Sequence, residues 1–519
     1  MASVDATRIP KNPAALIASA LLLAAAGALT FAVVARQSVA PVALATLVAA
    51  ALVITHRALG RWHVLVGVIV LIIMFIPIKR YKIAAELPFD LEPYRIVLAM
   101  VVALWIGAAL IDSKTRLRRS FLDKPLLLIL VSVIGSILTN IPRIGEQNFS
   151  TVKGVVVNRG DLSADALKKL LFLISFLLFF YVVVSVVRDE RTIHNVIKTL
   201  VTGAAIVAFS GIVEARTGFN VFDHVEDVFP VLNFQGALSE AGIARGGRLR
   251  VYASAQHPIA LATMLVMVLP LALYLIRHTG NKRWALASTA IGLGAISTVS
   301  RTSVTALATV AIVFGLLRPR EMKRFVPLLL PMVIVIHLAV PGAIGGLRQS
   351  FFPAQGLIQD QTAFSGRASG ERLRPELERI GANPAFGQGY GTRLTDGGPR
   401  QNARVLDNEW LGTASETGLV GLFAWLWLFC RFVNRAGREA KRDLSSRGWL
   451  LAAMTASVTA FAVSMLTFDA FSFIQGTVVL FIIAALASCT LATSGPWPSE
   501  RRRPLFATAS FRRSLGQIS

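Results

Sequence analysis

Arginine is concentrated, and lysine is absent, in three polar segments between apolar runs: about 214–256, the short link at 301 and about 342–418. A guanidinium group offers a planar fork of donors, which matches phosphate oxygens better than the point charge of lysine does. The pattern predicts a phosphate-binding surface, although these arginines could instead form salt bridges with Glu371, Glu376, Glu378, Asp396 and Asp407. The arginines are Arg216, Arg245, Arg248, Arg250, Arg301, Arg348, Arg367, Arg372, Arg374, Arg379, Arg393, Arg400 and Arg404.

Arg301 is the strongest candidate among these arginines for a functional role. It lies in the segment Ser297–Ser303, which joins two apolar runs with almost no loop between them. An arginine so close to hydrocarbon is costly unless it pairs or faces a wet cavity. The position therefore favours a functional role over that of an interfacial arginine whose side chain reaches outward to water.

Two further positions carry groups that could hold or move a proton. His257 precedes Pro258 at the start of an apolar run, where it is either structural or catalytic. Asp407, Asn408 and Glu409 precede another apolar run. They could cap a helix, or their carboxylates could accept a proton from a hydroxyl group. No set of His, Cys and acidic residues has zinc spacing, so we expect no metal and no cofactor.

The elements that position these residues must be membrane helices. Hydrophobic residues make up 54% of the 519-residue chain and charged residues only 16%, too few to coat a soluble domain. The apolar runs do not alternate as barrel strands do, and open sheets cannot exist in lipid. We therefore predict an all-α, polytopic integral membrane protein with about 14 transmembrane helices and two long extracytoplasmic loops. The segments are 14–34, 39–55, 62–78, 94–111, 125–142, 167–187, 195–213, 257–276, 284–299, 302–317, 325–341, 419–433, 449–468 and 471–492.

The basic residues indicate the orientation of these helices. Most of the charge of +24 lies in short loops that fall on one side when the segments alternate, with Lys79–Lys82 as the main exception. The positive-inside rule then places both termini in the cytoplasm. The stretch 14–34 is too long for a signal-peptide core and is expected to be a retained first helix. Nucleic-acid binding is not expected, because no module for it is present.

The alternation of the predicted segments across the membrane divides the chain into six parts. About seven transmembrane helices occupy 1–213, an extracytoplasmic loop 214–256, about four helices 257–341, a large extracytoplasmic loop 342–418, about three helices 419–492 and a basic cytoplasmic tail 493–519. Within the larger loop, Glu371–Ile380 is predicted to be helical, because Gly381 and Asn383-Pro384 follow it. Cys430 and Cys489 lie inside apolar runs, so a disulfide framework is not expected.

Four motifs in the region of about 200–435 together resemble the O-antigen ligase and polymerase family of bacterial membrane glycosyltransferases. They are Arg250 with Gln256–Ala262, the segment Ser300–Thr302, the segment Arg372–Gly391, and Asp407–Leu411 with Ser415–Leu422. The resemblance implies a metal-independent, inverting transfer of a glycan from undecaprenyl diphosphate to an acceptor hydroxyl. It also implies that Arg250 and Arg301 hold the diphosphate. Fixed guanidinium groups would stabilise the negative charge that grows on the diphosphate during the transfer.

One residue departs from the family pattern. Ligases of this family usually carry His where this chain has Asp407. Asp407 could serve as the base, as could Glu409 or His257, and the replacement favours a polymerase over a lipid A–core ligase. The predicted catalytic residues are Arg250, Arg301, Asp407 and Glu409, and the predicted substrate-binding residues are Arg248, His257, Arg367, Arg372 and Asn408.

The resemblance leads us to expect a polymerase of O-antigen, capsule or exopolysaccharide in the bacterial inner membrane. Its partners would be an undecaprenyl-diphosphate-linked glycan donor, a glycan acceptor, the bilayer, and a chain-length regulator and a flippase. A ligase with another acceptor is the first alternative. An exporter or flippase of lipid-linked glycans is the second, and it would depend on residues along a path through the middle of the membrane.

Overall fold

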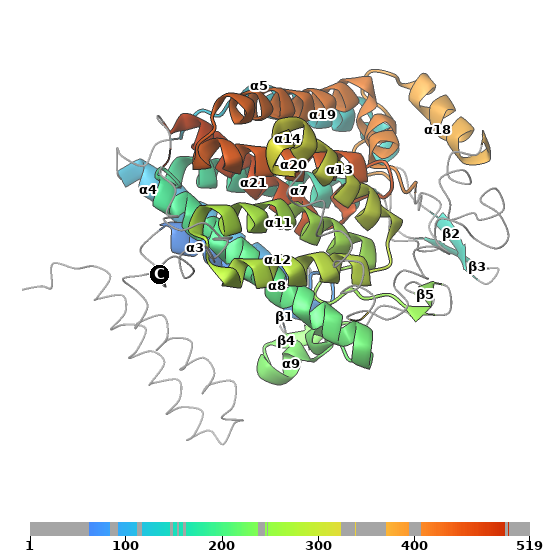
Figure 1. The fold of residues 1–519 in the computed structure, drawn as a ribbon. Helices are drawn as coiled ribbons and strands as arrows, with labels where there is room; N and C mark the ends of the chain where they lie inside the picture. Colours follow the sequence, from blue (N-terminus) through green and yellow to red (C-terminus); the bar gives the residue numbers. More distant parts are fainter. Residues whose placement is uncertain are drawn as a thin grey trace, which may run out of the picture.

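Apolar helices dominate the computed structural model of the chain (Figure 1). The structure describes residues 62–83, 92–111, 117–145, 149–152, 155–158, 162–236, 244–245, 248–322, 338, 370–393, 406–493 and 497. The long helices are α3 (Trp62–Phe75), α4 (Pro93–Ile111), α5 (Asp123–Thr139), α7 (Ser163–Val186), α8 (Glu190–Thr217), α11 (Pro258–Thr279), α12 (Lys282–Ser297), α13 (Arg301–Leu317), α19 (Glu409–Arg442), α20 (Ser446–Ser464) and α21 (Ile474–Ala492).

These helices correspond to the predicted apolar segments. Each segment from 62–78 to 302–317, and from 419–433 to 471–492, contains or overlaps one of them. The segments 14–34, 39–55 and 325–341 lie outside the described residues. Among the described helices, five are long and apolar enough to cross a membrane, namely α7, α8, α11, α19 and α21. The chain is therefore mostly helical, as the sequence indicated.

Local sequence signals set several of the helix ends. Asp189 caps α8 by accepting a hydrogen bond from the backbone N–H of Thr192 at 2.8 Å. At its far end, α8 stops at Gly218, which has a φ of 73°. Gly280, with a φ of 67°, ends α11, and Asn281 then caps α12. Glycine adopts this left-handed conformation at no steric cost, so the chain reverses directly between α11 and α12.

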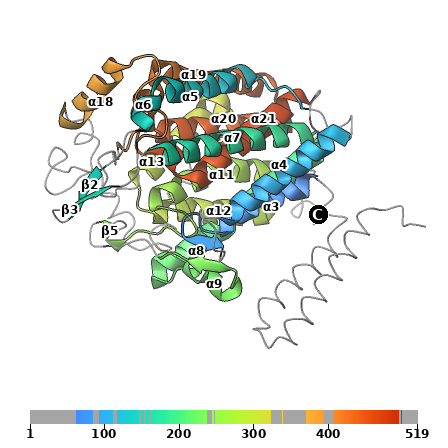
Figure 2. The same cartoon turned by 180° about the vertical axis from the view of Figure 1, so that it is seen from behind.

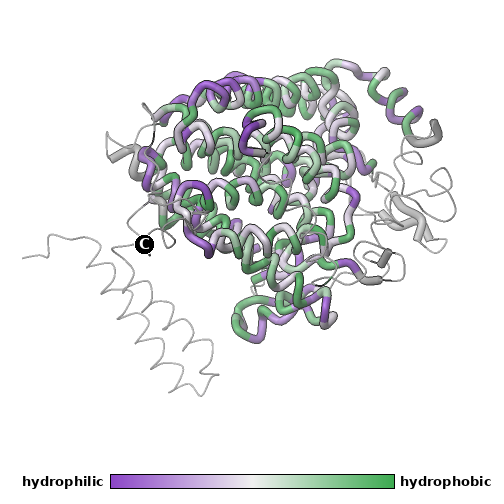
Figure 3. Tube along the Cα trace, viewed as in Figure 1, coloured by the Kyte–Doolittle hydropathy of each residue, from purple (hydrophilic) through white to green (hydrophobic). Residues whose placement is uncertain are grey.

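Helix α11 lies in the middle of the bundle, with α8 and α12 on one side and α20 and α21 on the other (Figure 1). Figure 2 shows α5 and α19 side by side at one edge, where they pack against each other. Hydrophobic residues cover the helices along most of their length (Figure 3). Helix α5 exposes a stripe of large apolar residues at helical spacing, namely Leu127, Val131, Ile134 and Leu138. Such a stripe suits contact with lipid chains rather than water.

Helix α19 begins ten residues earlier than the predicted segment 419–433. Gly418 has non-helical backbone angles (φ 68°, ψ −168°), which divide the element into a short first part, from Glu409, and a long second part. The end of the predicted loop 342–418 is therefore helical. The predicted start of the apolar segment coincides with the break at Gly418, because hydropathy marks only the second part.

Short elements occupy the connections. Strand β1 (Tyr81–Ile83) pairs antiparallel with β4 (Leu232–Phe234), β2 (Phe149–Val152) with β3 (Val155–Asn158), and β5 (Ala244–Arg245) with β6 (Arg248–Leu249). Helix α18 (Gly370–Ala382) contains the predicted helix Glu371–Ile380. The others are α6 (Ile141–Ile144), η1 (Val221–His224), α9 (Val225–Val228), α14 (Pro319–Met322) and η3 (Ala470–Ser472).

The connections form two groups of contacts. At one end, Arg80 pairs with Asp223, Gln475 donates to the Ser254 carbonyl, and Arg393 pairs with Asp469. At the other end, Arg318 donates to the Asp443 carbonyl, His278 contacts Ser446, and Ser120 contacts Ser488. Segments predicted to lie outside contact one another, and so do those predicted to lie inside.

Candidate active site

The link between α20 and α21 (residues 465–473) contacts three of the segments that carry predicted site residues. Thr467 hydrogen-bonds to Thr302, the neighbour of Arg301, with 2.8 Å between the two hydroxyl oxygens. The Met465 carbonyl accepts the backbone N–H of Glu409 at 2.7 Å. The rings of Phe473 and His257 lie 5.9 Å apart between centroids. Three regions that are distant in sequence are therefore fastened to one short link.

Arg250 lies against the link that carries Arg301. Its Nε donates to the carbonyl oxygen of Thr298 at 3.0 Å, and its side chain is buried. Thr298 ends α12, and Arg301 begins α13 three residues later. Arg301 itself is partly exposed, at the first turn of α13. The two arginines predicted to act together thus occupy neighbouring positions at one end of the bundle.

A buried hydrogen-bond network fixes the segment that follows Arg250. Both carboxylate oxygens of Glu214 accept backbone N–H groups, from Tyr252 at 3.2 Å and from Ala253 at 2.8 Å. Arg80 donates to the Ala253 and Ala255 carbonyls, and its guanidinium lies 4.8 Å from the centre of the Tyr252 ring. Burial lowers the pKa of Arg80, and the carboxylate of the neighbouring Asp223 opposes this effect only in part. The segment is therefore held by side chains from α8 and from the α3–β1 connection.

Asp407 is held in an unusual backbone conformation. Its φ is 50°, which a residue other than glycine adopts rarely, although Asp does so more readily than most. The Asp469 carboxylate accepts the backbone N–H groups of Leu406 at 3.2 Å and of Asp407 at 3.3 Å. The Asp407 side chain remains partly exposed. Val299 (φ 46°) and Ala253 (φ 45°) show the same left-handed conformation beside Arg301 and after Arg250. Strain of this kind is found preferentially at functional sites.

Arg393 and three acidic residues form a buried ionic cluster, which we call the Arg393 cluster. Arg393 lies 2.7 Å from Asp469, 3.5 Å from Glu409 and 3.8 Å from Glu416, and it is 1% exposed. Burial alone would lower the pKa of Arg393, but the three carboxylates outweigh burial and raise the pKa. Lys169 extends the cluster, with its Nζ 3.0 Å from Glu416. The guanidinium thus stays charged and joins the loop before α19 to the α20–α21 link.

Glu409 and Asn408, both predicted site residues, have structural partners. Glu409 is buried, faces Arg393 and accepts the backbone N–H of Phe471 at 3.0 Å. The Asn408 side chain caps α19 by accepting the N–H of Leu411 at 3.1 Å. The helix-capping alternative is therefore realised at Asn408. Of the two predicted carboxylates, only Asp407 has a partly exposed side chain.

His257 caps α11. Its Nδ1 accepts the backbone N–H of Ile259 at 3.2 Å, so a neutral ring in this arrangement carries its proton on Nε2. Nε2–H is a donor and cannot accept a proton. The geometry therefore suits binding of an acceptor atom better than service as a base.

The remaining predicted residues are described only in part. Arg248 lies in β6 and Arg372 in α18, and the structure describes the backbone of each. Arg367 lies outside the described residues. Arg374 pairs with Glu378 and Arg379 with Glu376. For these two arginines the salt-bridge alternative is observed with predicted partners, whereas Arg393 pairs with acidic residues outside that predicted set.

A cavity of about 310 Å³ adjoins the Arg393 cluster. Its wall includes Arg393, Glu409 and Glu416 of the Arg393 cluster, together with Lys79 and Lys168. Arg250 and Arg301 do not line it. Acidic and basic groups from both halves of the chain thus surround a space beside the loop that carries Asp407.

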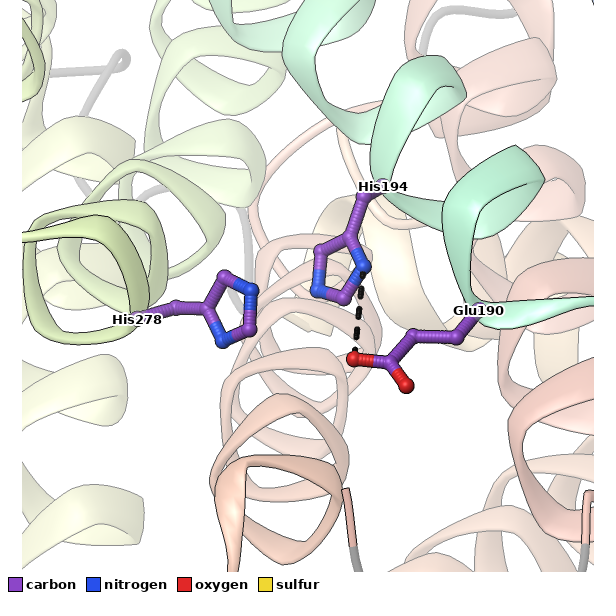
Figure 4. Close-up of side chains that lie close together, drawn as sticks. All are labelled: Glu190, His194 and His278. Carbon is purple, nitrogen blue, oxygen red and sulfur yellow. Dashed lines mark ion pairs between the residues drawn. The ribbon is translucent and has the colours of Figure 1, made fainter. Parts of the chain in front are cut away.

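Glu190, His194 and His278 lie together at the opposite end of the bundle (Figure 4). Their potential ligand atoms lie within 4.8 Å of one another. The two imidazole rings are stacked, with 4.3 Å between centroids and 11° between planes. Their in-plane lone pairs run in parallel planes and cannot converge on one ion at about 2.0–2.1 Å. In addition, His194 Nε2 hydrogen-bonds to the Tyr274 hydroxyl at 2.6 Å. We therefore do not assign a metal to this group.

Sequence reasoning missed the roles of Arg393, Glu416 and Asp469. Arg393 was one of the thirteen loop arginines and Glu416 lay within the motif Ser415–Leu422, but neither was predicted to be a site residue, and nor was Asp469. The available signal was Asp469, an acidic residue in a link only a few residues long between two apolar runs. A carboxylate at such a position requires a cationic partner, although sequence does not identify the partner.

Comparison with known proteins supports the resemblance. Residues 285–426 match the family model described as O-Antigen ligase (Wzy_C). The matched range contains Arg301, Arg393, Asp407 and Glu416, whereas Arg250 and His257 lie before it. No curated protein matches the chain. Over this range the match supports the resemblance to the O-antigen ligase and polymerase family.

Proposed function

We propose that the chain polymerises glycan repeat units carried on undecaprenyl diphosphate, at the periplasmic face of the bacterial inner membrane. The observation that carries the proposal is the contact of Arg250 with the link that bears Arg301. The family match over residues 285–426 supports glycan transfer in general. The polymerase, the donor and the location go beyond that match.

In the proposed reaction, Arg250 and Arg301 bind the diphosphate of the donor. The bond between the anomeric carbon and the phosphate oxygen breaks, and the acceptor oxygen forms the new bond on the opposite face of the sugar. The diphosphate leaves with the bonding electrons, and fixed guanidinium groups stabilise its increasing negative charge. No metal is needed for this step.

We assign the proton transfer to Asp407. Its side chain is partly exposed, whereas Glu409 is buried against Arg393. Asp469 holds the Asp407 backbone, and therefore the direction in which its side chain points. The carboxylate accepts the hydroxyl proton as the new glycosidic bond forms.

The decisive experiment compares lipid-linked glycans in cells with and without the protein. Loss of a polymerase leaves single repeat units on undecaprenyl diphosphate. Accumulation of full-length chains on that carrier would instead identify a ligase, the alternative favoured by the name of the matching family. Complementation with Arg301→Ala should reproduce the accumulation seen without the protein.

A further inference from the structure

We propose that the cavity of about 310 Å³ beside the Arg393 cluster binds the phosphate-bearing head of a second lipid-linked substrate. This inference rests on the proposed function. It assigns the acceptor a site of its own, separate from the donor diphosphate at Arg250 and Arg301. The volume falls at the lower end of the range typical of small-molecule sites, which suits a head group with the first part of a chain.

The lining of the cavity changes from charged to apolar. Its charged part comes from the α3–β1 connection, β1 and the first turns of α4 and α7, and includes Lys79, Lys82, Arg95, Lys168 and Lys169. Six basic and four acidic side chains line the cavity, a formal excess of positive charge. An anionic group is therefore the ligand that this part would attract.

The apolar part begins at Phe172, about 6 Å along α7 from Lys168, and reaches Phe176 at about 12 Å. Lys168 and Phe176 are separated by eight residues, and an α-helix rises about 1.5 Å per residue. Phe172 and Leu173 lie between them, and Phe481 of α21 packs against Phe176. A free sugar phosphate has no hydrocarbon chain that could contact these apolar side chains. A lipid phosphate fits it, because its head binds cations while its chain contacts aromatic and aliphatic groups.

The α20–α21 link separates this cavity from the arginine pair. On one side, Thr467 of the link contacts Thr302, next to Arg301. On the other, Phe471 and Ser472 of the link line the cavity. Asp407 is fastened to the same link through Asp469. Two phosphate-binding regions thus flank the proposed base, as transfer between two lipid-linked glycans requires.

The test measures how many polyprenyl diphosphates bind to the full-length protein in detergent. The probe is farnesyl diphosphate, and native mass spectrometry gives the stoichiometry. We expect two bound molecules for the wild type, and one each for K79Q/K82Q/K168Q and R250Q/R301Q. The control K198Q/K282Q/K441Q removes three lysines near the other end of the bundle and should retain two.

Further variants and probes separate the possible results. Leu173→Trp fills the apolar part and should also reduce the stoichiometry to one, without removing a charge. Inorganic pyrophosphate should compete at least about 10-fold less well than farnesyl diphosphate, because it cannot use the apolar wall; equal competition would overturn the lipid assignment. Two molecules bound to K79Q/K82Q/K168Q would overturn the second site. Two bound to R250Q/R301Q would instead contradict the proposed donor site and leave the cavity assignment intact.

Discussion

The Nε atom of Arg250 lies 3.0 Å from the carbonyl oxygen of Thr298, although 48 residues separate them. This hydrogen bond fastens the segment before α11 to the connection between α12 and α13. Arg301 begins α13 three residues after Thr298. One contact therefore brings two sequence motifs together. Because Arg250 is buried and Arg301 is partly exposed, a catalytic role is tested separately from the fold at Arg301.

Arg301→Ala should lower glycan transfer by at least about 10²–10³-fold, since it removes a fixed cation from the leaving diphosphate. Size-exclusion chromatography should still show folded protein, because Arg301 is partly exposed at the start of a helix. Product length is measured on gels of extracted glycan. Arg374→Ala is the matched control, as Arg374 is 83% exposed and pairs only along its own helix with Glu378 among the pairs described. Polymer of normal length from Arg301→Ala would contradict the role of Arg301.

Asp407→Asn should retain the fold and reduce the transfer rate by about 10²–10⁴-fold, the usual contribution of a general base. Asparagine tolerates the left-handed φ of 50° but cannot accept the proton. Initial rates with purified protein provide the measurement. Asp227→Asn, at a side chain that is 71% exposed, should leave the rate unchanged. A wild-type rate for the Asp407→Asn protein would show that another residue serves as the base.

Arg393→Met should destabilise the protein by about 3–5 kcal/mol, because it leaves buried carboxylates without their cation. Glu409, Glu416 and Asp469 are each between 5% and 7% exposed in their side chains. A lower melting temperature in detergent is the expected readout. Arg283→Met changes an arginine at the other end and should have little effect. Equal melting temperatures for Arg393→Met and the wild type would show that the cluster is unimportant for stability.

Gly418→Ala should destabilise α19. Gly418 has a φ of 68°, and an added Cβ would lie 2.6 Å from the Phe386 backbone nitrogen and closer still to the Ala385 carbonyl. Both contacts are with backbone, so a side chain cannot move aside. Gly315→Ala should instead stabilise α13 by about 0.5–1 kcal/mol, because a Cβ there meets nothing within 4 Å and alanine favours a helix. Thermal unfolding of both variants tests the contrast, which would fail if Gly418→Ala matched the wild type.

Part of the site could be predicted from sequence because its signals are local. Arg301 stood between two apolar runs with no loop, and Asn408 preceded a run in a capping position. Other parts depend on pairs far apart in the chain. Arg393 and Asp469 are 76 residues apart, and Lys169 and Glu416 are 247 apart. No periodicity or motif connects such residues, since their proximity follows from how the helices pack.

The lysine-free arginine pattern was correct as an observation and incomplete as a description of the site. It concerned only the segments 214–256, 301 and 342–418 and therefore passed over Lys79, Lys82, Lys168 and Lys169. These lysines line the same cavity as Arg393 and Glu409. These lysines precede the region of about 200–435 that carries the family resemblance, so the resemblance gave no reason to select them.

The sequence by itself determined the apolar helices, because the cost of burying charge in hydrocarbon acts on each segment separately. The orientation of their connections across the membrane stays a prediction from the positive-inside rule. Tertiary structure alone decided which connections meet. It made the α20–α21 link the common support of Arg301, Asp407 and His257. The physical reason is that helix packing depends on the shapes of many side chains at once. The hydropathy of a segment is only the sum of the contributions of its own residues.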